Sequence, residues 1–207
     1  MQAEKSSSPT KHKRPLLIDI DGTSSTTMGL WLQLYNFRHS KRHRLSDLKN
    51  WNSWECIGAT ESEFWEIFDF MEKSGLYDIA PMMSTQIPRY ISELSEYYDV
   101  SFCTARSVNG ALSAKRWMKY HHIPDIPVRR VGRDGMSNKL KIFENAILFD
   151  DSPLLIPLMK DHPDELLCLH LSPWNREFAD KLPENVIPTT NWHDFRNLMI
   201  DMAGEPM

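Results

Sequence analysis

The first apolar segment of the chain ends in two carboxylates that could act together. Segment 16–23 reads Leu-Leu-Ile-Asp-Ile-Asp-Gly-Thr, which is typical of a buried strand that a glycine ends. In an extended strand Asp19 and Asp21 point to the same side, so both side chains can reach one ligand. Gly22 permits a sharp turn beside them, and Thr23 supplies a hydroxyl and an amide. Such a pair suits nucleophilic or acid–base chemistry, and by itself it is equally typical of a solvated strand end.

A second pair of carboxylates, Asp150 and Asp151, ends the apolar segment 147–149. Because like charges gathered at one edge of a sheet repel, two such pairs need a cation to neutralise them. An all-oxygen site suits Mg²⁺, which keeps much of its water shell and leaves room for a substrate phosphate. The two acidic pairs therefore predict a magnesium site that also binds phosphate.

Other side chains could bind the phosphate itself. Thr104 ends an apolar run, and the amides of Ala105 and Arg106 follow it near the expected start of a helix. An uncharged hydroxyl beside free amides suits a phosphate oxygen. Lys139 offers a point cation for the phosphate and for a nearby carboxylate, and Lys141 competes with it for that role.

The segments that carry these residues alternate with helical patterns. Expected strands are 16–23, 100–104 and 147–151, with weaker candidates at 128–131 and 166–171, and expected helices are 84–98, 109–118 and 192–202. Strands that alternate with helices predict an α/β fold, in which helices cover both faces of a Rossmann-like parallel sheet. Ligands of such folds bind beyond the carboxyl ends of the strands, where most of the candidate residues stand.

The stretch between the first strand and the first of these helices is too long for a loop. It holds a capping box at residues 60–63 and two apolar helical stripes, which predict a small helical insert over residues 24–81. The expected α/β core then comprises residues 15–23 and 82–207. Residues 1–14 are rich in serine and basic side chains and lack apolar periodicity, so they predict a flexible basic arm.

Composition excludes several classes of protein. The 207 residues are 41% apolar and 25% charged, which is ordinary usage for a folded chain. A net charge of −4 argues against a polycation that binds duplex nucleic acid, and no apolar run is long enough to span a membrane. Three widely separated cysteines predict neither a disulfide scaffold nor a zinc site, and the polar start lacks a secretion signal. We expect a cytoplasmic protein without a membrane contact.

Taken in order, these motifs resemble those of the haloacid dehalogenase-like (HAD) phosphatase superfamily. The shared pattern is Asp-x-Asp-Gly-Thr, an apolar strand ending in threonine, a lysine, and an apolar strand ending in two aspartates, and it covers residues 16–151. The helical insert stands where that superfamily carries its cap. The Thr-Ala-Arg form of the second motif, the small cap and the chain length are most similar to the 5′(3′)-deoxyribonucleotidase branch.

The resemblance implies a role for each motif residue. Asp19 is expected to be the nucleophile, which forms an aspartyl-phosphate, and Asp21 the general acid. These two residues, the second through its carbonyl, are expected to hold Mg²⁺ together with Asp150 and Asp151. A further group is expected to bind the substrate phosphate: Thr104, Ala105, Arg106 and Lys139. Together they predict a Mg²⁺-dependent phosphomonoesterase.

Aromatic side chains concentrate in the predicted insert. Ten of the 22 in the chain fall within residues 28–77: Trp31, Tyr35, Phe37, Trp51, Trp54, Phe64, Trp65, Phe68, Phe70 and Tyr77. Most are expected to form the core of the insert, with one or two facing the site, where a nucleobase could stack on them. This favours a nucleoside monophosphate as the substrate and a 5′-nucleotidase or deoxyribonucleotidase as the enzyme.

The basic run 38–44 keeps an alternative open. Such a run is typical of a solvated face, but with the basic arm it could bind a nucleic acid, which would make the protein a polynucleotide end (3′) phosphatase. Two further alternatives are a HAD phosphatase of small metabolites and a non-catalytic HAD scaffold that senses a phosphorylated ligand or binds a protein. The two intact aspartates of the first motif argue against the last of these.

Overall fold

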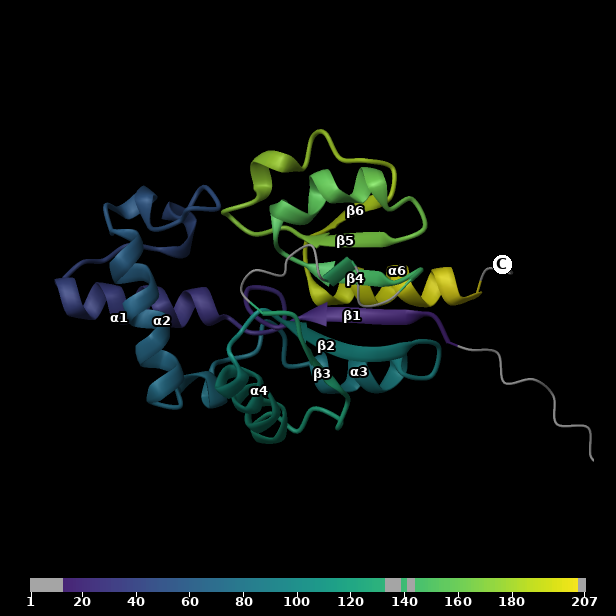
Figure 1. Cartoon of the computed structure of the whole chain (residues 1–207), viewed down its shortest axis with the longest axis horizontal. Coiled ribbons are helices and arrows are strands. Elements are labelled where there is room, and N and C mark those ends of the chain that lie inside the picture. Colours follow the sequence, from purple (N-terminus) through teal and green to yellow (C-terminus); the bar gives the residue numbers. More distant parts are fainter. Residues whose placement is uncertain (1–12, 133–138, 141–143, 205–207) are drawn as a thin grey trace, which may run out of the picture.

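Six parallel strands form one sheet at the centre of the chain, of which the computed structural model describes residues 13–132, 139–140 and 144–204. The strands are β1 (Pro15–Asp19), β2 (Asp99–Thr104), β3 (Val128–Arg130), β4 (Ile147–Asp150), β5 (Leu166–His170) and β6 (Val186–Thr189). Their order is β3-β2-β1-β4-β5-β6, and every neighbouring pair is parallel (Figure 1). The predicted α/β fold with a parallel sheet is confirmed.

Each face of the sheet has its own apolar cluster. Three helices cover one face: α3 (Ile87–Leu94), α4 (Val108–Tyr120) and α6 (Trp192–Gly204). Strand residues such as Ile18 and Phe102 pack in one cluster with them. The intervening strand residues, such as Leu17 and Leu148, pack against the 3₁₀ segment η4 (Pro153–Asp161) on the other face. Because the strands are buried on both faces, their apolar runs are continuous rather than alternating.

Most predicted elements are present, some with shifted ends. α3 begins at Ile87 and not near Ser84, whose hydroxyl accepts a hydrogen bond from the Gln86 amide (3.2 Å) in the preceding turn. The sequence analysis does not predict β6, because this strand has only four residues and one of them is Pro188. Proline is tolerated there because β6 lies at the edge of the sheet.

Two helices dominate the segment between β1 and α3. They are α1 (Thr27–His39) and α2 (Glu61–Lys73), with short 3₁₀ turns at η1 (Leu45–Asp47), η2 (Glu55–Ile57) and η3 (Leu76–Ile79). They share an apolar cluster around Trp31, Phe64 and Met71, which Trp174 joins from the loop after β5. Figure 1 shows α1 and α2 on the side to which β1 points, beyond the carboxyl ends of the strands. Residues 24–81 are called the insert from here on, and their division from the core as a separate unit stays a prediction.

The start of the described chain is tied to the core. Lys13 Nζ donates to the carbonyl oxygen of Ser95 (2.7 Å), and the Arg14 guanidinium donates to main-chain carbonyl oxygens in the loops before β4 and β5 (2.8 Å each). These two residues, expected in the flexible arm, thus hold the beginning of β1, and residues 1–12 of that arm lie outside the described residues. No helix in the described part of the chain is long and apolar enough to cross a membrane.

The capping box of α2 gives a test of local stability. Thr60 Oγ1 accepts a hydrogen bond from the Glu63 amide (3.2 Å), and Glu63 Oε2 accepts one from the Thr60 amide (2.8 Å). We expect Thr60→Ala to lower the free energy of unfolding by about 1 kcal/mol in urea denaturation, because it leaves a helix N–H group without its cap. Ser62→Ala, on an exposed position of the same turn, is the control and should change it by less than about 0.5 kcal/mol. Equal effects of the two substitutions would contradict the capping role.

Burial of His170 at the end of β5 predicts a pH-dependent stability. Its Nδ1 has no hydrogen-bond partner among the described residues, and burial lowers its pKa to about 4 from a usual 6.5. The unfolded chain therefore takes up this proton at a higher pH than the folded chain, so stability is complete above the usual pKa and falls as the pH drops toward the lowered one. We measure the free energy of unfolding by urea denaturation at pH 7 and at pH 5. From pH 7 to pH 5, this free energy should fall by about 2 kcal/mol less in His170→Phe than in the parent. The exposed His122→Asn should lose as much as the parent, and an equal loss in His170→Phe would refute the assignment.

Candidate active site

A turn after β1 brings Asp19 and Asp21 to the same cavity. β1 ends at Asp19, and the Ile20 carbonyl oxygen accepts hydrogen bonds from the amides four and five residues further on (3.0 and 2.7 Å). Asp21 therefore lies in the turn, where Gly22 adopts the left-handed conformation with φ 82°. The expectation of a strand that continues through both carboxylates is wrong, because the chain already folds back at Ile20. The two side chains nevertheless line one cavity.

A buried lysine bridges the ends of β1 and β4. Lys139 is 2% exposed, and its Nζ donates to Asp19 Oδ1 (2.6 Å) and to Asp150 Oδ2 (2.5 Å). Burial alone would lower the pKa of this ammonium, but the negative charges of Asp150 and Asp19 raise it well above its usual value. Burial raises the pKa of Asp19 to about 8, since Lys139 offsets only part of that effect and the other carboxylates add to it. Ionising Asp19 at neutral pH therefore calls for more positive charge.

Three carboxylates crowd together at this point. Oxygens of Asp19, Asp150 and Asp151 lie within 4.8 Å of one another, and all three side chains are buried. Asp151 Oδ2 accepts a hydrogen bond from Trp174 Nε1 (2.8 Å), which orients it. Burial and the charges of the two neighbouring aspartates raise the pKa of Asp151 well above its usual value. Three buried acidic groups against one lysine fit a hard divalent cation, which takes oxygen ligands of this kind.

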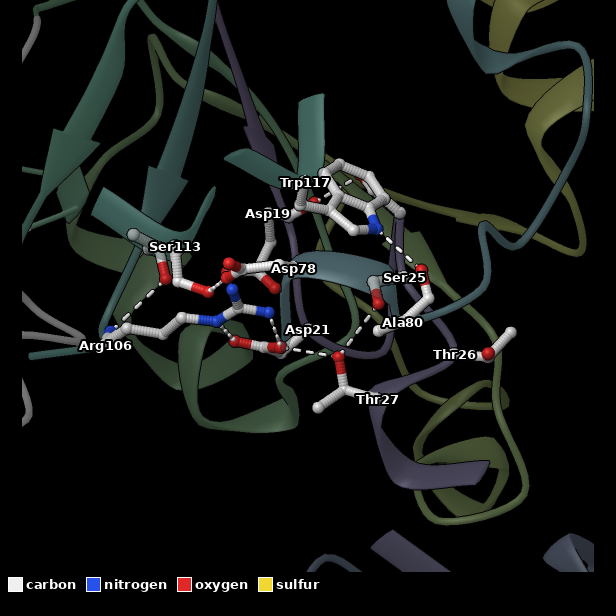
Figure 2. A network of polar contacts seen from close by, with 12 residues as sticks. Asp19, Asp21, Ser25, Thr26, Thr27, Asp78, Ala80, Arg106, Ser113 and Trp117 are labelled. Atoms are coloured by element: carbon white, nitrogen blue, oxygen red, sulfur yellow. Dashed lines mark hydrogen bonds and ion pairs between the residues drawn. The ribbon is translucent and has the colours of Figure 1, made fainter. Parts of the chain in front are cut away.

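Arg106 binds the second carboxylate of the first motif. Its guanidinium donates through Nε to Asp21 Oδ2 (2.7 Å) and through Nη2 to Asp21 Oδ1 (2.5 Å), as Figure 2 shows. Asp21 Oδ1 also accepts a hydrogen bond from Thr27 Oγ1 (2.6 Å). Burial alone would raise the pKa of Asp21, but Arg106 outweighs it and holds this pKa below its usual value. The carboxylate predicted to be a general acid is thus ionised in this arrangement.

The remaining nitrogen of Arg106 does not take part in the ion pair with Asp21. The guanidinium carbon lies 4.0 Å from the centroid of the Tyr77 ring, and Nη1 is buried without a hydrogen-bond partner among the described residues. The sequence predicts that Arg106 binds the substrate phosphate. In this structure most of the guanidinium is occupied by Asp21, and Nη1 is the group that remains.

The other predicted phosphate ligands take different positions. Thr104 ends β2, is 1% exposed, and its Oγ1 accepts a hydrogen bond from the Arg106 amide (3.2 Å). Thr104 is not among the described residues that line the cavity, and Lys141 lies outside the described residues. The structure brings the other predicted site residues to one cavity: Asp19, Asp21, Ala105, Arg106, Lys139, Asp150 and Asp151.

This cavity has a volume of about 580 Å³ and extends from the strand ends into the insert. Aromatic rings form much of its wall: Trp51, Trp54, Phe64, Trp65, Phe68, Tyr77 and Trp174. Its charged groups come mostly from the ends of β1, β2 and β4, and its rings come mostly from the insert. The cavity therefore joins a polar end to an apolar one.

More rings reach the cavity than the sequence analysis expects. Six of the ten aromatic residues of the insert line it, against the one or two that were expected. Of the remaining four, Trp31 and Tyr35 are buried in the apolar cluster, and Phe37 and Phe70 are exposed. A signal for two of the six exists in the sequence, because Trp51 and Trp54 stand in a stretch without helical periodicity. Trp174 carries no such signal, since it is far from the insert in sequence.

The basic run 38–44 lies away from the cavity. Arg38 Nη1 is 3.3 Å from Glu66 Oε2, so α2 partly neutralises the run, and His39 Nε2 lies 3.4 Å from Glu63 Oε1 on the same helix. None of the seven residues lines the cavity. This arrangement favours a solvated face over a surface that guides a polyanion to the site.

Comparison with known proteins identifies a family but no curated relative. A family model described as "5' nucleotidase, deoxy (Pyrimidine), cytosolic type C protein" matches residues 13–203. No curated protein matches the chain.

Solved structures of HAD hydrolases share the fold of this chain at low sequence identity. A HAD hydrolase of family IA from Entamoeba histolytica is 12% identical, with a TM-score of 0.53 over 93% of this chain and 100% of that one. The HAD-hydrolase YfnB from Bacillus subtilis, solved with magnesium, is 14% identical, with a TM-score of 0.52 over 91% and 99%. A HAD family hydrolase from Deinococcus radiodurans, solved with phosphate and sodium, is 10% identical, with a TM-score of 0.56 over 93% and 96%. At these identities the likeness shows the fold alone.

The close approach of Gly22 to Asp151 predicts a position-specific loss of stability. A Cβ at Gly22 would lie 2.2 Å from Asp151 Oδ2, whereas a Cβ at Gly58, also left-handed with φ 73°, would meet no atom within 4 Å. We expect both Gly→Ala substitutions to lose about 1 kcal/mol of unfolding free energy to backbone strain. Gly22→Ala should lose about 2 kcal/mol more, because moving Asp151 breaks its hydrogen bond with Trp174. Urea denaturation of the two variants measures the difference, and equal losses would show that the contact does not matter.

Proposed function

The chain belongs to the family of 5′ nucleotidase, deoxy (pyrimidine), cytosolic type C proteins, and on that premise we propose that it hydrolyses nucleoside monophosphates in a Mg²⁺-dependent reaction through a phosphorylated Asp19. The resemblance to the HAD phosphatases is confirmed, and the protein is a hydrolase of phosphoric monoesters. The observation that carries the finer proposal is the cavity in which buried carboxylates and aromatic walls meet.

Asp19 is the group proposed to attack phosphorus. In the first step an oxygen of Asp19 forms a bond to phosphorus while the bond to the ester oxygen breaks, and the leaving oxygen takes a proton from Asp21. In the second step a water molecule attacks phosphorus, Asp21 takes one of its protons, and the bond to Asp19 breaks to release inorganic phosphate. Lys139, which contacts Asp19 (2.6 Å), offsets the negative charge on the phosphoryl group.

Arg106 links this chemistry to substrate binding. While its guanidinium holds Asp21, the pKa of that carboxyl stays below its usual value and the group has no proton to donate. A phosphate dianion carries more charge than a carboxylate and can also bind a guanidinium through two oxygens, and Arg106 Nη1 has no hydrogen-bond partner among the described residues. In the proposed reaction the phosphate draws Arg106 away from Asp21, whose pKa then rises so that it can act as the acid.

The buried carboxylates fit the predicted Mg²⁺ ion. Asp19, Asp150 and Asp151, whose oxygens cluster within 4.8 Å, would hold it together with the main-chain carbonyl of Asp21. When bound, the ion supplies positive charge that favours the ionised form of Asp19 and offsets the charge of the substrate phosphate.

The aromatic walls support a nucleotide as the substrate. A volume of about 580 Å³ lies in the range of small-molecule sites. Stacking of a base on aromatic rings contributes about 1–3 kcal/mol, and it tolerates different bases. A small metabolite without a flat ring could not stack on these rings, so the nucleoside monophosphate is the better fit. A cytoplasmic location stays a prediction.

The alternatives left open by the sequence have less support. A polynucleotide end phosphatase calls for a basic surface beside the cavity, and the run 38–44 lies off the cavity with Arg38 and His39 paired to α2. A scaffold that only senses a ligand does not call for a carboxylate such as Asp19 to be held beside Lys139 in the polar end of the cavity.

Release of inorganic phosphate from a panel of esters tests the proposal. The panel holds nucleoside monophosphates, sugar phosphates, 3′-phosphorylated oligonucleotides and an aryl phosphate, each with Mg²⁺ and with a chelator. We expect the highest kcat/KM on nucleoside monophosphates and no turnover after chelation. Activity on sugar phosphates with none on nucleotides would reject the proposed substrate. Oligonucleotide turnover that falls steeply with salt would favour the polynucleotide activity instead.

Substitution of the nucleophile tests the mechanism. We expect Asp19→Asn to lower kcat on the best substrate by about 10³-fold or more, because the amide cannot form the phosphorylated intermediate. Asp125→Asn, an exposed position outside the cavity, is the matched control and should keep the activity of the parent. Turnover by Asp19→Asn at the level of the parent would rule out Asp19 as the nucleophile.

A further inference from the structure

One acidic side chain in the cavity takes no part in the proposed reaction. Glu72, near the end of α2, lines the cavity together with Ser107. Glu72 Oε1 accepts a hydrogen bond from Ser107 Oγ (2.6 Å), and no described side chain donates to Glu72 Oε2. A wall that is otherwise largely aromatic thus contains a carboxylate with acceptor capacity to spare.

Glu72 continues the ring-bearing face of α2. Phe64, Phe68 and Glu72 follow one another at intervals of four residues, so their side chains lie on the same face of the helix. All three line the cavity. Successive turns are about 5.4 Å apart, so Glu72 lies one turn from Phe68 in the same cavity wall, a separation shorter than a nucleoside is long.

The carboxylate is held from the core side. Ser107 donates to Glu72 and accepts a hydrogen bond from the Gly110 amide (3.1 Å), as the N-cap of α4. Gly110 leaves room for both Arg106 and Glu72, since a Cβ there would lie 2.6 Å from Arg106 Cβ and 3.3 Å from Glu72 Oε2. The start of α4 holds Ser107, and Ser107 holds the Glu72 carboxylate. This carboxylate therefore has a defined position, as discrimination between similar ligands requires.

We propose that Glu72 selects the nucleoside part of the substrate by accepting a hydrogen bond from it, an inference that rests on the proposed nucleotidase function. A carboxylate accepts hydrogen bonds and does not donate them, so it favours an N–H or O–H group and disfavours a carbonyl oxygen at the same place. Two groups of a nucleotide distinguish substrates in this way. One is the exocyclic amino group of cytosine, where uracil has a carbonyl, and the other is the 2′-hydroxyl of ribose, where deoxyribose has hydrogen.

Four nucleotides test this selection and show whether Glu72 recognises the amino group of cytosine or the 2′-hydroxyl of ribose. CMP, dCMP, UMP and dUMP vary the base and the sugar independently, and kcat/KM is measured for each. We expect the parent to prefer cytosine over uracil, or ribose over deoxyribose, by about tenfold, as the loss of a hydrogen bond to a charged group predicts. Glu72→Met removes the acceptor while keeping an unbranched helix former, and it should bring that ratio to within about twofold of one. If the cytosine-to-uracil ratio falls to about one, Glu72 recognises the base, and if the ribose-to-deoxyribose ratio does so, it recognises the sugar.

Two further variants control for structural effects. Glu72→Gln keeps one acceptor oxygen without the charge and should give an intermediate ratio. Glu66→Met, on the same helix but outside the cavity, should retain the ratios of the parent. A ratio of two substrates measured on one sample does not depend on how much of a variant is folded.

The outcomes separate this inference from the proposed function. If Glu72→Met keeps the ratios of the parent, or lowers all four rates equally, the selection by Glu72 is overturned while the nucleotidase function stands. If none of the four nucleotides is hydrolysed but an aryl phosphate is, the proposed function fails and the selection fails with it.

Discussion

Holding several carboxylates together out of water is the constraint on which the site depends. Asp19, Asp150 and Asp151 are buried with oxygens within 4.8 Å of one another, an arrangement that is destabilising unless positive charge lies among them. Lys139 supplies one such charge between two of them. The acidity that remains is what fits the group to a cation, and it also makes the ionisation of Asp19 depend on further positive charge.

The order of the strands in the sheet brings the charged residues of the site together. β1 and β4 are neighbours because the chain crosses the sheet after β3. The first and last acidic motifs therefore meet, although the segment from the start of one to the end of the other is about two-thirds of the chain. β2, on the other side of β1, contributes Arg106 just beyond its end. Parallel strands thus deliver the groups for phosphate chemistry at one edge. The insert, which lies beyond that edge in Figure 1, contributes the rings that a phosphate site by itself would lack.

The sequence predicts those parts of the fold and the site that follow from strand and helix patterns, and it does not predict those that depend on contacts between distant side chains. The positions of Asp19 and Asp150 follow from apolar strands and their ends, and the capping box of α2 follows from residue types alone. The choice of Lys139 over Lys141 rests only on the resemblance to the family motifs. The ion pair of Arg106 with Asp21 does not follow, because it depends on a turn after β1 and on the Tyr77 ring. β6 is too short and too rich in polar neighbours to be found without its partner strand.

Trp174 belongs to three parts of the molecule at once. By sequence it follows β5, by packing it joins the apolar cluster of α1 and α2, and by its indole nitrogen it holds Asp151 (2.8 Å). Any fluctuation that loosens the helices from the sheet therefore also withdraws a hydrogen-bond donor from a buried acid. The packing of the insert and the arrangement of the carboxylates are in this way coupled through one side chain.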